Sequence, residues 1–270
     1  MLQSIVVPIV WLGGLGLLFG VVLGLAAKKF AVEESENVLK IKEVLPGANC
    51  GGCGFPGCGN FAEALSNGEA LPGSCTAISP MQLAQINDIL GADFLMDEKL
   101  RAVVLCGGCG EKSLQKFNPY GIFDCREAML IMGGNKVCEY GCLGFGTCEK
   151  VCPNDAIHVD ASTSRVVVDE EKCNGCGACE RACPKRIIVR IPVTSRVVVS
   201  CKSNRKGAQA KKICSVACIG CGLCKKACEY GAIEVENNLA SIDYEKCVNC
   251  GKCVEKCPTK AIQQHEVKSR

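Results

Sequence analysis

The most apolar stretch of the chain is an uncharged run of 23 residues from Ile5 to Ala27. A helix of about 20 apolar residues is long enough to cross the hydrocarbon core of a bilayer. The run therefore predicts one membrane-spanning helix. Residues 1–4 lack the basic start of a cleavable signal peptide. Lys28 and Lys29 follow directly, so the positive-inside rule predicts that the rest of the chain lies in the cytoplasm.

Shorter hydrophobic patterns predict a mixture of helices and strands after this run. Residues 33–45 and 60–66 have the spacing of short amphipathic helices, and Ser79-Pro80 offers a cap and first turn for a helix to about Leu90. Farther along, residues 102–105 predict a single strand. Alternating segments predict two hairpins, which pair residues 156–160 with 165–169 and residues 232–236 with 239–244. The predicted fold class is α+β.

The composition indicates that inorganic cofactors fill much of the interior. The chain has 270 residues with 25 cysteines, a net charge of +3 and only 5% aromatic residues. Disulfide scaffolds are usually short secreted chains, and an odd number of cysteines in C-x2-C repeats argues against them here. Zinc ribbons also contain C-x2-C pairs, but this density of cysteines suits an iron–sulfur cube better than a tetrahedral ion. Folding is therefore expected to depend on cluster insertion.

The densest cysteine motif is C-x2-C-x2-C-x3-C-P, formed by Cys173, Cys176, Cys179 and Cys183 before Pro184. In bacterial ferredoxins this run binds [4Fe–4S] clusters: the first three thiolates bind one cluster, and the fourth binds a second cluster. A crossing fourth ligand requires a partner run elsewhere in the chain. Cysteines upstream of this motif, ending at Cys152-Pro153, provide that run.

The whole arrangement occurs twice. Cysteines 142, 148 and 152 recur 76 residues later, and cysteines 173, 176, 179 and 183 recur 74 residues later. The difference indicates an internal duplication with a two-residue deletion in the connecting hairpin. We therefore predict two tandem ferredoxin modules, each binding two [4Fe–4S] clusters.

One ligand position of the first module does not contain cysteine, because Phe145 aligns with Cys221. Cys138 is the predicted substitute, and it aligns with Cys214, which is spare in the second module. A further four-cysteine set, C-x2-C-x4-C with a distant fourth cysteine, lies on a small N-terminal domain. The five predicted ligand sets are Cys50, Cys53, Cys58 and Cys75; Cys138, Cys142, Cys148 and Cys183; Cys152, Cys173, Cys176 and Cys179; Cys218, Cys221, Cys224 and Cys257; and Cys228, Cys247, Cys250 and Cys253.

A sixth cluster is predicted in the least familiar segment of the chain. Cys106, Cys109 and Cys125 are three thiols that do not close a [4Fe–4S] site. Cys201 has no counterpart in the ferredoxin pattern and is the predicted fourth ligand, with Cys214 as the alternative. Six sets would use 24 of the 25 cysteines.

These motifs divide the chain into five predicted parts. They are a transmembrane helix (1–29), a four-cysteine [4Fe–4S] domain (30–95), a cysteine-containing connecting segment (96–135), and the first (136–200) and second (201–270) ferredoxin modules.

Many closely spaced one-electron centres in one chain indicate an electron relay. No Rossmann glycine fingerprint, Walker loop or nucleophile–base pair occurs, so we expect no complete active site in this chain and no nucleic-acid partner. A basic stretch between Lys202 and Lys212 is either a solvated loop or a docking patch for an acidic carrier protein or lipid headgroups.

The order of these motifs resembles the B subunit of the Rnf complex in its long, polyferredoxin-type form. The resemblance rests on a spanning helix followed by Cys-Gly-Gly-Cys-Gly-Phe-Pro-Gly-Cys58, then Gly-Ile-Phe-Asp-Cys125 and Cys138-Glu-Tyr-Gly-Cys142. It covers essentially the whole chain. The resemblance implies an entry subunit of a membrane ferredoxin:NAD⁺ oxidoreductase that accepts electrons from soluble ferredoxin. It also implies membrane, flavin and NAD-binding partner subunits and a complex that pumps Na⁺ or H⁺.

Two other functions remain open at the level of the sequence. The chain could belong to a related system that reduces an iron–sulfur transcription regulator. Alternatively, it could be the polyferredoxin arm of a membrane hydrogenase or a formate-oxidising complex. Ferredoxin-dependent NAD⁺ reduction in membranes would distinguish the oxidoreductase from the regulatory system. The partners that co-purify, either flavin-bearing subunits or a nickel subunit, would distinguish it from the hydrogenase or formate-oxidising complex.

Overall fold

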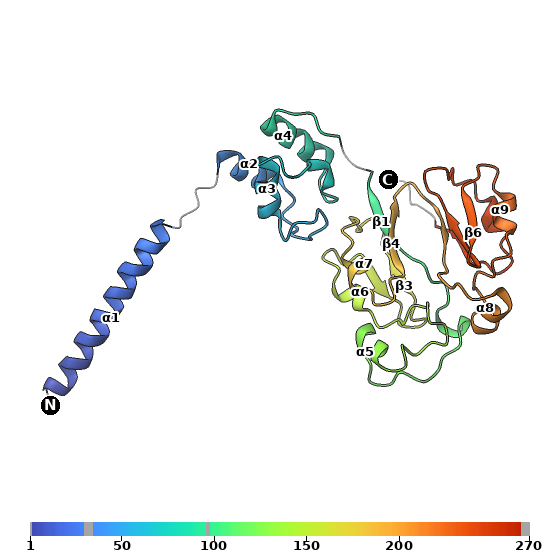
Figure 1. Ribbon diagram of the computed structural model, residues 1–270, viewed down its shortest axis with the longest axis horizontal. Helices are drawn as coiled ribbons and strands as arrows, with labels where there is room; N and C mark the ends of the chain where they lie inside the picture. Colours follow the sequence, from blue (N-terminus) through green and yellow to red (C-terminus); the bar gives the residue numbers. More distant parts are fainter. Residues whose placement is uncertain (1, 30–34, 96–97, 266–270) are drawn as a thin grey trace.

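The computed structural model describes residues 2–29, 35–95 and 98–265 (Figure 1). It has the predicted α+β character, with helices first and short strands and helices after residue 98. The N-terminal helix α1 (Leu2–Lys29) lies apart from the other elements in Figure 1. Large apolar side chains are exposed between Trp11 and Leu25, and Trp11 itself is 70% exposed. Within the described residues, no helix combines the length and hydropathy needed to cross a membrane, so the predicted span is not confirmed.

A small helical unit follows α1, and its elements agree with the predicted helices. It contains α2 (Glu36–Val44), α3 (Cys58–Ser66), the 3₁₀ turn η1 (Pro72–Ser74) and α4 (Pro80–Leu90). Its core includes Ile41, Phe61 and Ile86, all of which are almost completely buried. Ser79 caps α4 through a capping box with Gln82, whose side-chain amide also donates to the Val44 carbonyl of α2 at 2.8 Å. The loops that carry the four N-terminal cysteines are thereby fixed on a compact helical core.

Each ferredoxin repeat contains a hairpin at the predicted place. β2 (Ile157–Val159) pairs with β3 (Val166–Val168), and β6 (Ile233–Glu236) pairs with β7 (Leu239–Ile242), both antiparallel. The second hairpin turns on Asn237 and Asn238, whose φ values of 48° and 64° suit a two-residue loop. The longer loop of the first hairpin contains the two extra residues that the duplication predicts.

Two further sheets join segments that are distant in the sequence. β1 (Leu100–Val104) pairs antiparallel with β4 (Ile188–Pro192), and β5 (Val197–Val199) pairs with β8 (Ile262–Gln264). The predicted strand at residues 102–105 is β1, but its partner was not predicted. β1 precedes the first repeat and β4 follows it, and β5 and β8 flank the second repeat in the same way. In each repeat, the strand before the repeat therefore pairs with the strand after it.

Short helices carry or precede the remaining cysteines. Each of α6, α7, α9 and α10 begins directly after a glycine with φ between 71° and 77°, a conformation that glycine adopts without strain. The bounds are η2 (Gly110–Lys112), α5 (Cys125–Leu130), α6 (Thr147–Lys150), α7 (Ala178–Ala182), α8 (Gly207–Ile213), α9 (Leu223–Ala227) and α10 (Lys252–Glu255).

Candidate iron–sulfur sites

Four cavities after residue 98 are each lined by four cysteines. Their empty volumes, open solvent included, are about 330, 340, 380 and 470 Å³. The thiols surround a space rather than converge on one point: within the described residues, no three or more His, Cys, Asp or Glu side chains form a group that could hold a single metal ion. A cavity with four thiols around it fits the donor set of a [4Fe–4S] cluster.

The second repeat groups its cysteines as the sequence predicts. Cys218, Cys221, Cys224 and Cys257 line the cavity of about 330 Å³. Cys228, Cys247, Cys250 and Cys253 line the neighbouring cavity of about 340 Å³. In both cavities the fourth thiol comes from the other run, as the crossing pattern of bacterial ferredoxins requires.

The first repeat differs from the predicted grouping. Its cavity of about 380 Å³ is lined by Cys142, Cys148 and Cys183 together with Cys125, and not with Cys138. Cys125 starts α5, and its backbone N–H donates to the hydroxyl of Thr147 at 2.8 Å. Thr147 is only 1% exposed and directly precedes Cys148, so this hydrogen bond ties α5 to the ligand run. The thiol of Cys125, from the connecting segment, therefore lines the cavity in which the first repeat is one cysteine short.

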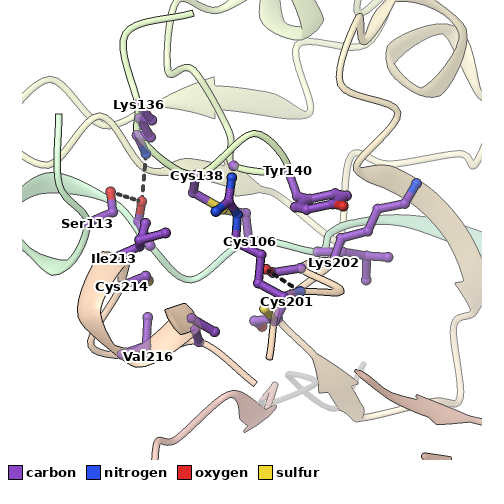
Figure 2. A pocket seen from close by; sticks show the side chains of 18 residues that line it. Cys106, Ser113, Lys136, Cys138, Tyr140, Cys201, Lys202, Ile213, Cys214 and Val216 are labelled. Carbon is purple, nitrogen blue, oxygen red and sulfur yellow. Dashed lines mark hydrogen bonds between the residues drawn. The ribbon is translucent and has the colours of Figure 1, made fainter. Parts of the chain in front are cut away.

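The largest of these cavities, about 470 Å³, lies between the two repeats (Figure 2). Its cysteines are Cys106, Cys138, Cys201 and Cys214, which we call the intermodule set. The sequence also placed Cys106 and Cys201 in one predicted ligand set, but with Cys109 and Cys125 as the other members. Cys138, the predicted substitute ligand of the first module, and Cys214, the predicted spare thiol of the second, both line this cavity.

A backbone clamp explains why residues 76 apart meet here. The N–H of Leu114 donates to the carbonyl of Ile213 at 2.9 Å, and the carbonyl of Leu114 accepts from the N–H of Val137 at 3.0 Å. Leu114 therefore lies between the two equivalent segments that carry Cys138 and Cys214. Cys109 is buried but lines none of the four cavities described above.

The other two predicted sets lie close to each other. Cys53, Cys58 and Cys75 pack with the N-terminal core, while Cys152, Cys173 and Cys179 pack with the core of the first repeat. The thiols of Cys50 and Cys176 lie next to each other across these two units, and each is the largest influence on the pKa of the other. This contact lowers the pKa of Cys50 to about 6 and raises the pKa of Cys176.

Burial favours the protonated form of several buried cysteines unless a metal centre replaces the proton. It is the largest cause that raises the pKa of Cys148 to about 12 and those of Cys179 and Cys201 to about 11, and neighbouring sulfurs raise each of them further. Thiolates gathered this closely need compensating positive charge. Iron supplies that charge when a cluster binds, with release of the thiol protons.

The intermodule cavity is also lined by three cationic side chains. Lys136 is only 3% exposed, and its ammonium donates to the Gly108 carbonyl at 2.6 Å. Lys202 donates to the carbonyl of Arg186, and Arg205 forms an ion pair with Glu139 at 2.9 Å. Lys202 and Arg205, two residues of the predicted basic stretch, therefore form contacts with other parts of the chain. Lys136 was not predicted, and the sequence offers no signal that would distinguish it from a surface lysine.

Comparison with known proteins gives the family. A family model described as a putative Fe-S cluster matches residues 45–77, and a 4Fe-4S dicluster domain matches residues 137–187 and 217–265. The chain is 46% identical to the B subunit of the Na(+)-translocating ferredoxin:NAD(+) oxidoreductase complex of Acetobacterium woodii, over 91% of this chain and 74% of the relative. It is 43% identical to the B subunit of the proton-translocating complex of Clostridium ljungdahlii, over 90% of this chain and 85% of the relative. For the B subunit of the ion-translocating oxidoreductase complex of Methanosarcina acetivorans, the identity is 38% over 93% of this chain and 95% of the relative. The chain belongs to the family of B subunits of ion-translocating ferredoxin:NAD(+) oxidoreductase complexes.

Proposed function

We propose that this chain is the subunit through which electrons from reduced ferredoxin enter a membrane-bound, ion-translocating ferredoxin:NAD(+) oxidoreductase complex. The observation that carries the proposal is the succession of four-thiol cavities in a chain whose relatives are subunits of such complexes. Bound [4Fe–4S] clusters supply one-electron transfer. Two electrons and one proton convert NAD(+) to NADH, and this step takes place on partner subunits.

The proposed ligand sets follow the cavities where these differ from the sequence pattern. We assign Cys125, in place of Cys138, to the set with Cys142, Cys148 and Cys183. The N-terminal set and the three remaining ferredoxin sets keep their predicted members. The contact between Cys50 and Cys176 supports a passage of electrons between the N-terminal unit and the first repeat.

We also propose that α1 anchors the subunit in the membrane part of the complex. The proposal rests on the uncharged run from Ile5 to Ala27 and on exposed apolar side chains such as Trp11, Leu12 and Leu17. These side chains need either lipid or the apolar surfaces of partner subunits around them. Lys28 and Lys29 favour a cytoplasmic position for the cysteine-rich part.

An acidic ferredoxin would find a positive surface at α8. Lys206, Lys211 and Lys212 lie at or beside this helix, and no acidic residue lies between Lys202 and Lys212. Complementary charge accelerates encounter between electron carriers and weakens with salt. We therefore propose α8 as part of the ferredoxin docking surface.

The proposed function is tested in inverted membrane vesicles that contain the whole complex. Reduced ferredoxin should drive NAD(+) reduction, and deletion of this subunit should abolish that reaction while NADH oxidation by an artificial acceptor continues on the other subunits. Normal ferredoxin-dependent NAD(+) reduction in the deleted vesicles would refute the proposal. Reduction of a purified iron–sulfur regulator without NAD(+) turnover would favour the regulatory alternative instead.

A further inference from the structure

The duplication extends beyond the ferredoxin runs. The N–H of Leu105 donates to the carbonyl of Ile187 at 2.8 Å, and the N–H of Ser200 donates to the carbonyl of Ala261 at 2.7 Å. Ile187 and Ala261 are 74 residues apart, the same offset that relates the later cysteines of the two repeats. β1 and β5 therefore occupy equivalent positions in the two repeats, although the sequence did not indicate this equivalence.

This equivalence relates Cys106 to Cys201. Each cysteine lies two residues beyond the end of its strand, β1 or β5. Cys138 and Cys214 are already related by the 76-residue offset. The intermodule cavity therefore receives one strand-end cysteine and one pre-module cysteine from each repeat (Figure 2).

We infer that Cys106, Cys138, Cys201 and Cys214 bind a [4Fe–4S] cluster between the two ferredoxin modules, and that the neighbouring Cys109 is not a ligand. Neither family model assigns this site, because three of the four cysteines lie outside both matched regions. The symmetric supply of thiols explains the choice of ligands. Cys109 lies three residues after Cys106, and the residue three positions after the equivalent Cys201 is Asn204. The second repeat therefore has no thiol that matches Cys109.

Contacts on both sides connect this site with the modules. The N–H of Cys142 donates to the sulfur of Cys106 at 3.3 Å. In the equivalent position, Cys218 belongs to the core of the second repeat against which Cys201 packs. Cys142 and Cys218 each line the nearest cavity of their own module. The intermodule cluster would therefore be a one-electron centre in direct contact with both modules, where each transfer oxidises one cluster and reduces its neighbour by one electron.

The surroundings of the cavity suit a cluster with four thiolates. Lys136, Lys202 and Arg205 bring positive charge to the lining, and the N–H of Cys142 donates to the sulfur of Cys106. Hydrogen bonds to sulfur and nearby positive charge both stabilise an anionic cluster. Cys109, in contrast, is adjacent to Cys106 in a C-x2-C pair but has no place in the cavity lining.

The test compares two serine variants of the full-length chain, purified without oxygen. Iron and acid-labile sulfide are measured per polypeptide, together with EPR spectra of the reduced and oxidised protein. Cys214→Ser should lose up to four iron atoms, or show an incomplete [3Fe–4S] signal when oxidised. Cys109→Ser should keep the wild-type iron content and spectra, because its thiol binds no iron.

Two further measurements keep the inference open to refutation. Cys201→Ser serves as a second variant from another element, should Cys214→Ser fail to fold, and the same loss is expected. In the partly reduced wild type, EPR signals of the two modules should be broadened by a paramagnetic neighbour, and this broadening should decrease in Cys214→Ser. Loss of four iron atoms in Cys109→Ser, or wild-type iron in both Cys201→Ser and Cys214→Ser, would overturn the inference. These readouts do not involve NAD(+), so they are independent of the proposed function.

Discussion

Replacing Cys125 by serine should remove one cluster from the first ferredoxin module without unfolding the module. Six filled sets correspond to about 24 iron atoms per chain, since each cluster contains four, so the variant should contain about 20. The helix α5 should persist, because the carboxylate of Asp124 still accepts from the N–H of Arg126 at 2.7 Å. The N–H of residue 125 can also still donate to Thr147.

A second substitution should restore the lost cluster. Phe145 occupies the position of Cys221 in the second repeat, and its flanking glycines have φ values of 82° and 71°, close to the 64° and 73° of the equivalent glycines. Because the backbone is alike, a thiol at residue 145 should reach the cavity as Cys221 does. We therefore expect Cys125→Ser combined with Phe145→Cys to return to about 24 iron atoms, with conventional ferredoxin ligation.

The assay is anaerobic iron and sulfide analysis of the purified full chain, with EPR of the reduced protein as the spectroscopic readout. Far-UV circular dichroism checks that the single variant retains its secondary structure. An iron content equal to the wild type in Cys125→Ser would refute the assignment of Cys125. If a folded double variant remained at about 20 iron atoms, the structural equivalence of residues 145 and 221 would be refuted instead.

Three more predictions test the electrostatics and packing around these sites. Lys136→Met should shift one midpoint potential to more negative values in an EPR-monitored titration, because a buried positive charge near the intermodule cavity stabilises the reduced state; an unchanged set of potentials would contradict this. Arg101→Met should lower the free energy of unfolding by about 2–4 kcal/mol in urea titrations, since the buried guanidinium pairs with Glu170 and donates to a buried carbonyl at 2.7 Å. Gly175→Ala should reduce cluster content far more than Gly222→Ala, measured by iron analysis. Both glycines have φ near 70°, but only at Gly175 would the new Cβ lie 2.3 Å from a backbone oxygen at the start of β1.

The hairpins and the ligands of the second repeat could be predicted because their information is local. β6 and β7 alternate in polarity around a two-residue turn, and Cys247, Cys250 and Cys253 lie within one short run. The spacing of such a run alone brings the sulfurs to one cavity. The same applies to α4, whose capping box is formed by Ser79 and Gln82, three positions apart.

The partner of Cys125 could not be predicted, because no local pattern connects it to the first module. Its backbone N–H donates to the hydroxyl of Thr147, which lies 22 residues farther along the chain, and this bond holds Cys125 at the cavity. Cys138 was the predicted substitute, because Phe145 aligns with Cys221 and leaves the first module one ligand short. The clamp at Leu114 draws Cys138 toward the second repeat instead.

The sequence by itself determined the chemistry of this protein: the number of cysteines, their duplicated spacing, the apolar N-terminal run and the family resemblance. Cysteine spacing within a run is a local geometric constraint, so the spacing itself indicates which sulfurs of that run lie together in the structure. Only the tertiary structure decided how the thiols outside the regular ferredoxin runs combine. The pairing of β1 with β4 and β5 with β8 brings strand-end cysteines together, because backbone hydrogen bonds between distant strands fix positions that no spacing along the chain can express.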